Sequence, residues 1–233
     1  MPKKNYYSVS KAEKGKTYDL IESALKQNLS EKEILKHWQA RAQRKGIQAV
    51  MSARHAVKEN IKAAELLKKE IFYFLEGHIE NKNIFELGCG IGRITAELAN
   101  KANHVVAIDF SSKMLKRAKN NLKKFDNVEL KLGKISDFRF KPKSFDLVFD
   151  CIVLLHILNP KELRRTVKKM KYLSNIVFIC EHTYEGPDFP ISKYSILRKP
   201  KEYEELFKPF RLIKQKTHFC AGDRFILMLF ENK

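Results

Sequence analysis

The sequence predicts an α/β fold: a doubly wound, mostly parallel seven-stranded sheet with an antiparallel end hairpin and an N-terminal helical cap. From residue 83 onward, short β-rich runs alternate with amphipathic helical runs, which is the pattern of βαβ units. The last two β-rich runs are joined only by a short connection around Gly222, which favours an antiparallel hairpin. Before residue 80, apolar residues recur at helical spacing and strand signals are almost absent.

The expected elements of the sheet domain follow from these runs. Strands are expected at residues 84–87, 104–109, 128–132, 145–150, 175–180, 211–217 and 224–230. Helices are expected at residues 92–101, 112–125, 160–171 and 201–208. Helices that connect parallel strands cover the faces of the sheet, so the strand ends are left to form a site.

Residues 1–80 are expected to form the helical cap and substrate segment, and residues 81–233 the main domain. Ser30 and Glu33 have the spacing of a capping box, which indicates a helix start. A further helix is expected over residues 53–76. The other apolar helical face of the cap comprises Leu20, Ile21, Ala24 and Leu25.

Several cap residues are candidates for a lid over the site. They are Trp38, Arg41, Arg54 and His55. The alternative is that Trp38 belongs to the core and that the arginines are simply solvated. The long segment 182–198, rich in aromatic and polar residues, is also expected to help choose the substrate.

The composition is that of a globular protein, with 44% hydrophobic and 31% charged residues among 233. The most apolar stretch, residues 145–158, contains acidic residues and is too short to span a bilayer. The basic N-terminus lacks the apolar run of a signal peptide, so we expect a cytoplasmic protein without a membrane partner. The four cysteines form no CxxC pair, and no metal-ligand spacing such as HExxH occurs. We therefore expect buried thiols and no metal site.

The formal net charge of +19 has two explanations. One is a polyanionic partner such as RNA. The other is a bias toward Lys and Glu of the kind found in proteins from organisms that live hot. The basic residues are spread along the whole chain, so both explanations stay open.

A glycine-rich turn follows the first expected strand and contains Gly88, Gly90 and Gly92. Glycines let the backbone bend sharply and let a ligand approach closely. The second strand ends in Asp109, whose carboxylate can accept hydrogen bonds from the two hydroxyls of a ribose. Together these features predict a nucleoside site at the carboxyl end of the sheet.

Two residues argue against a dinucleotide in this site. The dinucleotide fingerprint requires glycine at position 93, where this chain has Arg93. Glu86, directly before the turn, is unfavourable beside a pyrophosphate but suits a ligand with an ammonium group. The turn therefore favours a nucleoside that carries a cationic amino acid tail.

Three segments resemble motifs of the class I S-adenosylmethionine-dependent methyltransferases. Residues 86–95 (Glu-Leu-Gly-Cys-Gly-Ile-Gly-Arg-Ile-Thr) resemble motif I, and residues 106–118 (Val-Ala-Ile-Asp-Phe-Ser-Ser-Lys-Met-Leu-Lys-Arg-Ala) resemble motif II. Residues 145–156 (Phe-Asp-Leu-Val-Phe-Asp-Cys-Ile-Val-Leu-Leu-His) are similar to the fourth-strand motif. The resemblance covers about residues 80–181, with the motifs in the expected order.

The resemblance implies that S-adenosyl-L-methionine is the cofactor and S-adenosyl-L-homocysteine the product. The residues that it places at the cofactor are Glu86, Gly88, Cys89, Gly90, Gly92, Asp109, Phe110, Met114, Ile135 and Asp150. Asp109 is implied at the ribose, and Phe110 and Met114 at the adenine. The family usually has an acid where this chain has Lys134, so Asp137 or the backbone at Ile135 is expected to contact the adenine instead.

Methyl transfer is an in-line displacement, so positioning supplies much of the acceleration, and a base is needed only where the acceptor must lose a proton. The candidates for such a base are Asp150, His156, His182 and Tyr184, with packing as the alternative role for each. The chain lacks the [DN]PP[YF] motif of the family's enzymes that methylate exocyclic base nitrogens. It also lacks the Pro-Cys pair of the cytosine-C5 type, so DNA is not an expected substrate. We expect a small-molecule or protein acceptor, with RNA (tRNA or rRNA) as the alternative. A relative that binds the cofactor without turnover is disfavoured by the intact glycine turn.

Overall fold

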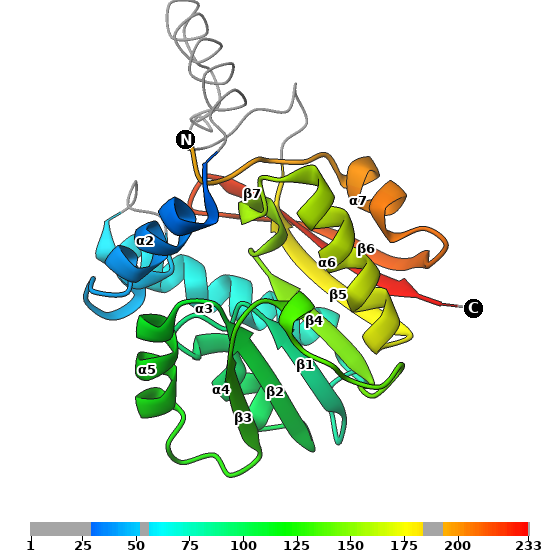
Figure 1. Cartoon of the computed structure of the whole chain (residues 1–233), viewed down its shortest axis with the longest axis horizontal. Helices are drawn as coiled ribbons and strands as arrows, with labels where there is room; N and C mark the ends of the chain where they lie inside the picture. The colour runs from blue at the N-terminus through cyan, green and yellow to red at the C-terminus, as the bar shows by residue number, and fades with distance from the viewer. Residues whose placement is uncertain (1–28, 52–55, 184–192, 233) are drawn as a thin grey trace, which may run out of the picture.

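The computed structural model describes residues 29–51, 56–183 and 193–232, which are arranged as one seven-stranded sheet with helices on both faces (Figure 1). The strands follow the order β3-β2-β1-β4-β5-β7-β6. Their bounds are β1 (Asn83–Leu87), β2 (His104–Asp109), β3 (Val128–Leu132), β4 (Leu147–Cys151), β5 (Ile176–His182), β6 (Arg211–Cys220) and β7 (Asp223–Glu231). All seven predicted strands are present, and the predicted fold class is confirmed.

Strands β1 to β5 pair in parallel, whereas β7 is antiparallel to both β5 and β6. The order in which strands are added reverses between β1 and β4. Strands β2 and β3 extend the sheet on one side of β1, and β4 and β5 extend it on the other. A sheet of this kind has its ligand crevice at the carboxyl ends of the strands beside that reversal. The predicted hairpin is also confirmed: β6 and β7 pair as far as Cys220 and Asp223.

The described helices are α2 (Glu31–Arg41), α3 (Val57–Phe74), α4 (Arg93–Ala99), α5 (Ser112–Asn121), α6 (Pro160–Leu173) and α7 (Pro200–Phe207). Three short 3₁₀ turns accompany them: η1 (Gly46–Ala49), η2 (Ile135–Asp137) and η3 (Leu154–His156). The predicted capping box before α2 is present, because the Ser30 backbone N–H donates to Glu33 and the Ser30 hydroxyl accepts from the Glu33 N–H.

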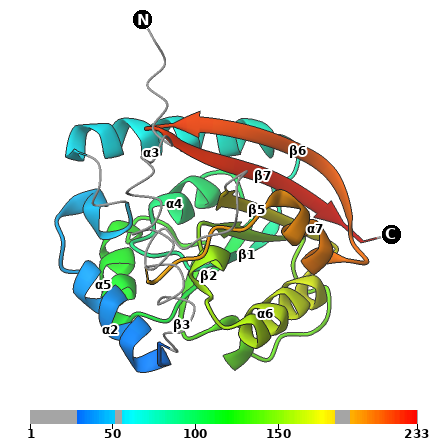
Figure 2. The same cartoon turned by 90° about the horizontal axis from the view of Figure 1, so that it is seen from above.

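Two apolar clusters fill the space between the layers. On one face, α3 and α4 pack on the sheet through Leu67, Ile71 and Leu98. On the other face, α6 and α7 pack through Val167 and Phe207 (Figure 2). Because helices cover both faces, the strands are buried on both sides, as their continuous apolar runs require.

The N-terminal segment divides between the core and the site. Helix α3 buries one face in the same cluster as the sheet, whereas α2 lies farther out, against α5. The division at about residue 80 therefore stays a prediction. The apolar face from Leu20 to Leu25, the candidate lid residues Arg54 and His55, and the candidate base Tyr184 lie outside the described residues. Among the helices described here, none combines the length and the apolar character needed to cross a membrane.

Candidate functional site

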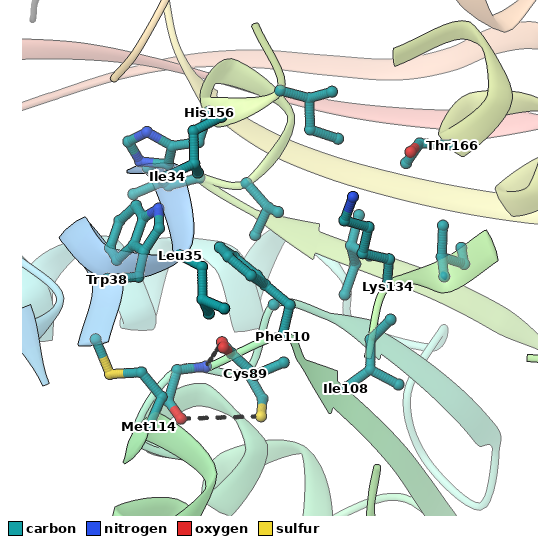
Figure 3. Close-up of a pocket in the computed structure, with 18 of the residues that line it drawn as sticks. Ile34, Leu35, Trp38, Cys89, Ile108, Phe110, Met114, Lys134, His156 and Thr166 are labelled. Atoms are coloured by element: carbon teal, nitrogen blue, oxygen red, sulfur yellow. Dashed lines mark hydrogen bonds between the residues drawn. The ribbon is translucent and has the colours of Figure 1, made fainter. Parts of the chain in front are cut away.

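A cavity of about 790 Å³ lies at the carboxyl ends of β1, β2 and β4, beneath helix α2 (Figure 3). Such a volume is typical of sites for small molecules and cofactors. Figure 3 shows Leu35 and Trp38 of α2 on one side of the cavity and Ile108 and Lys134 on the other. The predicted site residues that line it are Glu86, Gly88, Cys89, Gly90, Asp109, Phe110, Met114, Ile135 and His156.

The glycine turn after β1 is confined on both sides. Gly88 and Gly90 have positive φ angles of 64° and 56°. A Cβ at Gly88 would lie 2.5 Å from Cγ2 of Val153, and one at Gly90 would lie 2.9 Å from Cγ1 of Val50. At these two positions the turn therefore presents only backbone atoms to the cavity.

Gly92 has a different place, because it caps helix α4 with a φ of 80° and is not among the residues that line the cavity. A Cβ there would lie 2.8 Å from Cδ1 of Leu122, the C-cap residue of α5. Gly92 thus allows α4 and α5 to approach each other closely.

Glu86 places a carboxylate at the inner wall of the cavity. The residue is only 3% exposed, and no described residue donates a hydrogen bond to its Oε2 atom. Burial raises the pKa of Glu86 to about 7. A buried acceptor without a donor is costly, so this position suits a ligand that supplies an ammonium group.

Asp109 ends β2 and joins that strand to the glycine turn. Its Oδ2 accepts from the Gly90 N–H at 2.9 Å, and its Oδ1 accepts from the Ser111 N–H at 2.8 Å. Burial raises the pKa of Asp109 to about 6. Each carboxylate oxygen has a second lone pair, so both can still accept from the hydroxyls of a ribose.

The wall after β3 is formed by residues around Lys134. The Lys134 N–H donates to Oδ2 of Asp137 at 2.8 Å, so this carboxylate is held at the cavity. The Lys134 ammonium forms an ion pair with Glu31 at the start of α2, with 2.5 Å between Nζ and Oε1. Lys134, at the position where the resemblance leads us to expect an acid, therefore connects the cavity wall to α2.

Helix α2 lies over the cavity and Trp38 is among the lining residues. The role of Trp38 as a lid stays a prediction. The Trp38 indole meets the His156 ring edge-on, with 4.7 Å between centroids. Arg41, a second candidate, donates to the carbonyls of Ala49 and Met51 and so holds the chain that follows the helix. From α5, Arg117 donates to the carbonyls of Ala42, Arg44 and Gly46.

The two ring nitrogens of His156 differ in their hydrogen bonding. Its Nδ1 lies 2.8 Å from the Tyr194 carbonyl oxygen, and because a carbonyl only accepts, Nδ1 carries the proton. This leaves a lone pair on Nε2. Burial lowers the pKa of His156 to about 4, so the ring is neutral at physiological pH.

Two other predicted residues lie away from the cavity lining. His182 is buried at the end of β5, stacked on Phe225 and 3.5 Å from Oδ1 of Asp223. Asp150 is fully buried below the site.

The cavity also has lining residues that the sequence did not assign to it. Val153 and Ile157 follow β4, whereas Arg165 and Thr166 lie in the first two turns of α6. The position of Val153 after a strand end is a signal that could have found it. No comparable signal marks α6, because its place beside the cavity depends on packing.

Residues 84–174 match the family of methyltransferase domains. Among curated relatives, phosphoethanolamine N-methyltransferase 3 of Arabidopsis thaliana is 33% identical over 157 residues, which are 63% of this chain and 32% of that protein. The chain thus spans about a third of the length of such curated relatives.

Two solved structures share the fold. The N-methyltransferase NodS of Bradyrhizobium japonicum WM9, in complex with S-adenosylhomocysteine, has a TM-score of 0.66 at 15% identity, covering 85% of this chain and 98% of that chain. The 1,6-didemethyltoxoflavin-N1-methyltransferase of Burkholderia thailandensis, which also holds S-adenosylhomocysteine, has a TM-score of 0.62 at 17% identity, covering 73% and 78%.

Proposed function

The chain belongs to the class I S-adenosylmethionine-dependent methyltransferases, and on this premise we propose that it transfers a methyl group from S-adenosylmethionine to a small-molecule acceptor. The observation that carries the proposal is the buried Oε2 atom of Glu86, which lacks a donor and faces a glycine-lined cavity. When bound, the cofactor supplies an electrophilic methyl group on a sulfonium sulfur.

The residues present fit this cofactor. Glu86 would accept from the ammonium group of its amino acid tail, and Gly88 and Gly90 would leave room for that tail. Asp109 would hold the ribose hydroxyls, with Phe110 and Ile135 beside the adenine. Each of these residues lines the cavity, which supports the assignment.

The acceptor would lie between α2 and the start of α6. The side chains on this part of the wall include Trp38, His156, Ile157 and Thr166, most of which are apolar or aromatic. Helix α2 covers the site, and a covered site favours a small acceptor over a folded RNA or a protein surface. Relatives named phosphoethanolamine N-methyltransferases support the same class.

Three exposed cations among the lining residues favour an acceptor with an anionic group. They are Lys32, Lys161 and Arg165, and Arg165 lies 4.0 Å from the carboxylate of Glu162, which also lines the cavity. A phosphate or carboxylate on the acceptor would be attracted by these cations, while its amine reaches the interior. An amine with an acidic group is therefore the first acceptor to test.

His156 is the proposed base of the reaction. Its Nε2 lone pair would accept a hydrogen bond from the acceptor amine, and this directs the amine lone pair toward the methyl group. Because His182 does not line the cavity, the proposal assigns no catalytic step to it.

The cofactor assignment is tested by titration calorimetry with S-adenosylhomocysteine. We expect Asp109→Ala to weaken binding at least about tenfold, because charge-assisted hydrogen bonds are lost. Asp126→Asn, a change of an exposed acid outside the cavity, is the control and should bind like the parent protein. No binding by the parent protein would overturn the proposal.

The acceptor class is tested with methyl-labelled cofactor against phosphoethanolamine, ethanolamine and RNA from the native host. We expect label in phosphoethanolamine and much less in ethanolamine, which lacks the anionic group. Transfer to RNA alone would contradict the small-molecule assignment and favour the alternative that the net charge of +19 suggests.

A further inference from the structure

The turn η3 brings two parts of the site together. Val153 directly before it packs against the glycine turn, since a Cβ at Gly88 would meet the Val153 side chain. His156 at its end faces Trp38 of the lid. Any shift of this turn would move the proposed base relative to the cofactor.

We infer that Glu181 and Arg198 are positioning residues, which hold this turn from beneath and so set the distance between methyl acceptor and donor. The inference rests on the proposed function, because only methyl transfer requires that distance to be correct. Neither residue is among those that line the cavity, so both act through the turn.

Glu181 holds the amide side of the turn. Its Oε1 accepts from the Val153 N–H at 3.0 Å and the Leu154 N–H at 2.7 Å, and its Oε2 accepts from the Leu155 N–H at 3.2 Å. The residue is fully buried. Three successive N–H groups around one carboxylate form a cradle for a negative charge.

Arg198 holds the carbonyl side of the same turn. Its Nη1 donates to the Leu154 carbonyl and its Nη2 to the Ile157 carbonyl, both at 2.9 Å. It is 6% exposed, and its own carbonyl accepts from the Thr183 hydroxyl at 2.8 Å. The guanidinium is planar and rigid, so two bonds fix the turn in orientation as well as position.

The backbone before the turn is in a conformation that needs such support. Ile152 has a φ of 62°, in the left-handed region that β-branched residues rarely adopt. Its N–H donates to the Cys180 carbonyl at 2.8 Å. A conformation of this kind persists only where surrounding contacts determine it, and it is often found at functional sites.

A second buried carboxyl, that of Asp150, lies beside Glu181. Burial and the adjacent Glu181 raise the pKa of Asp150 well above its usual range. Burial also raises the pKa of Glu181, whereas Asp150, the Leu154 N–H and Arg198 act in the opposite direction.

The experiment compares Glu181→Gln with Ser174→Ala. Ser174 is also fully buried and donates to the Asp146 carbonyl, but it lies near the other end of β5 and away from the cavity. We expect Glu181→Gln to lower kcat with the best acceptor at least about tenfold, because small misplacements are costly in methyl transfer. The affinity of Glu181→Gln for S-adenosylhomocysteine should stay within about threefold of the parent value. Ser174→Ala should keep the parent kcat even where it lowers Tm by a similar amount.

A second pair of variants covers the case in which Glu181→Gln does not fold. Arg198→Lys keeps one donor and Arg198→Met keeps none, so we expect kcat to fall in that order. In ¹⁵N-histidine spectra, the His156 ring signal should shift in Arg198→Met and stay unchanged in Ser174→Ala. If kcat falls only in proportion to Tm in all variants, or if the His156 signal is unmoved, the positioning role is wrong.

The two proposals fail in different ways. If the parent protein binds no S-adenosylhomocysteine, the proposed function fails, while the His156 signal still reports whether Glu181 and Arg198 position the turn. If the parent protein binds cofactor and methylates an acceptor, an unchanged kcat in folded Glu181→Gln overturns the positioning role alone.

Discussion

The Trp38 indole meets the His156 imidazole edge-on, with the two ring planes at 78° and their centroids 4.7 Å apart. This contact joins helix α2 to the turn after β4, two segments more than a hundred residues apart in the sequence. Trp38 and the proposed base His156 therefore form one wall of the cavity (Figure 3).

Replacement of Trp38 by alanine should weaken acceptor binding more than cofactor binding. The change removes a large aromatic surface, and we expect the acceptor KM to rise about tenfold while S-adenosylhomocysteine affinity changes little. Trp38→Phe keeps the ring contact and should stay near the parent value. Equal losses in the two affinities would show that α2 covers the cofactor instead of the acceptor.

Gly88→Ala should abolish cofactor binding. Its φ of 64° strains any side chain, and the added Cβ would lie 2.5 Å from Val153. The matched control is Gly77→Ala, where φ is 81° but nothing lies within 4 Å. The control should lose about 1 kcal/mol of stability from strain alone and bind S-adenosylhomocysteine normally. Normal binding by a folded Gly88→Ala variant would contradict the confined turn.

The affinity for S-adenosylhomocysteine should rise with pH between about pH 5 and 7. Burial raises the pKa of Glu86 to about 7 and of Asp109 to about 6, so both hold protons at the low end of this range. An ammonium and two hydroxyls favour the ionised carboxylates, so binding releases protons, and one coupled proton changes the affinity about tenfold per pH unit. Calorimetry in buffers of different ionisation enthalpy measures that release.

The same two carboxyls should make the free energy of unfolding fall as pH rises, whereas they make the cofactor affinity rise. Their folded pKa values lie above the ordinary values of 4.5 and 3.8, so the native state binds more protons than the unfolded state across this range. Their contribution to the free energy of unfolding is therefore lost as pH rises from about 4 to 7. Glu86→Gln should flatten the pH dependence of both Tm and cofactor affinity, and a variant with unchanged pH dependence would exclude Glu86 as the coupled group.

His156 should remain neutral throughout the physiological range. Burial lowers its pKa to about 4, so its ring signals should not titrate between pH 6 and 8 in NMR spectra. His156→Gln should lower kcat about 100-fold or more with little change in S-adenosylhomocysteine affinity. A ring that titrates near its ordinary pKa of 6.5 would contradict the buried geometry.

Local sequence signals were sufficient for the elements and for the cofactor side of the cavity. The alternation of apolar runs predicted each strand, because a strand covered on both faces needs a continuous apolar segment. The glycine turn and Asp109 were predictable for a related reason. They follow strand ends directly, and the carboxyl ends of adjacent parallel strands meet at one edge of the sheet.

The part of the cavity that we propose for the acceptor is formed by contacts between segments that are distant in sequence. Nothing in the neighbourhood of Trp38 or Arg165 indicates that α2 and α6 meet over the same cavity. Gly92 shows the converse, because its place in the motif suggested a ligand contact, whereas the structure puts it between α4 and α5. Sequence by itself determined where the strands lie along the chain and which chemical groups stand at their ends, since both follow from local patterns. Only the tertiary structure decided which distant side chains close the site, because that depends on how the helices pack.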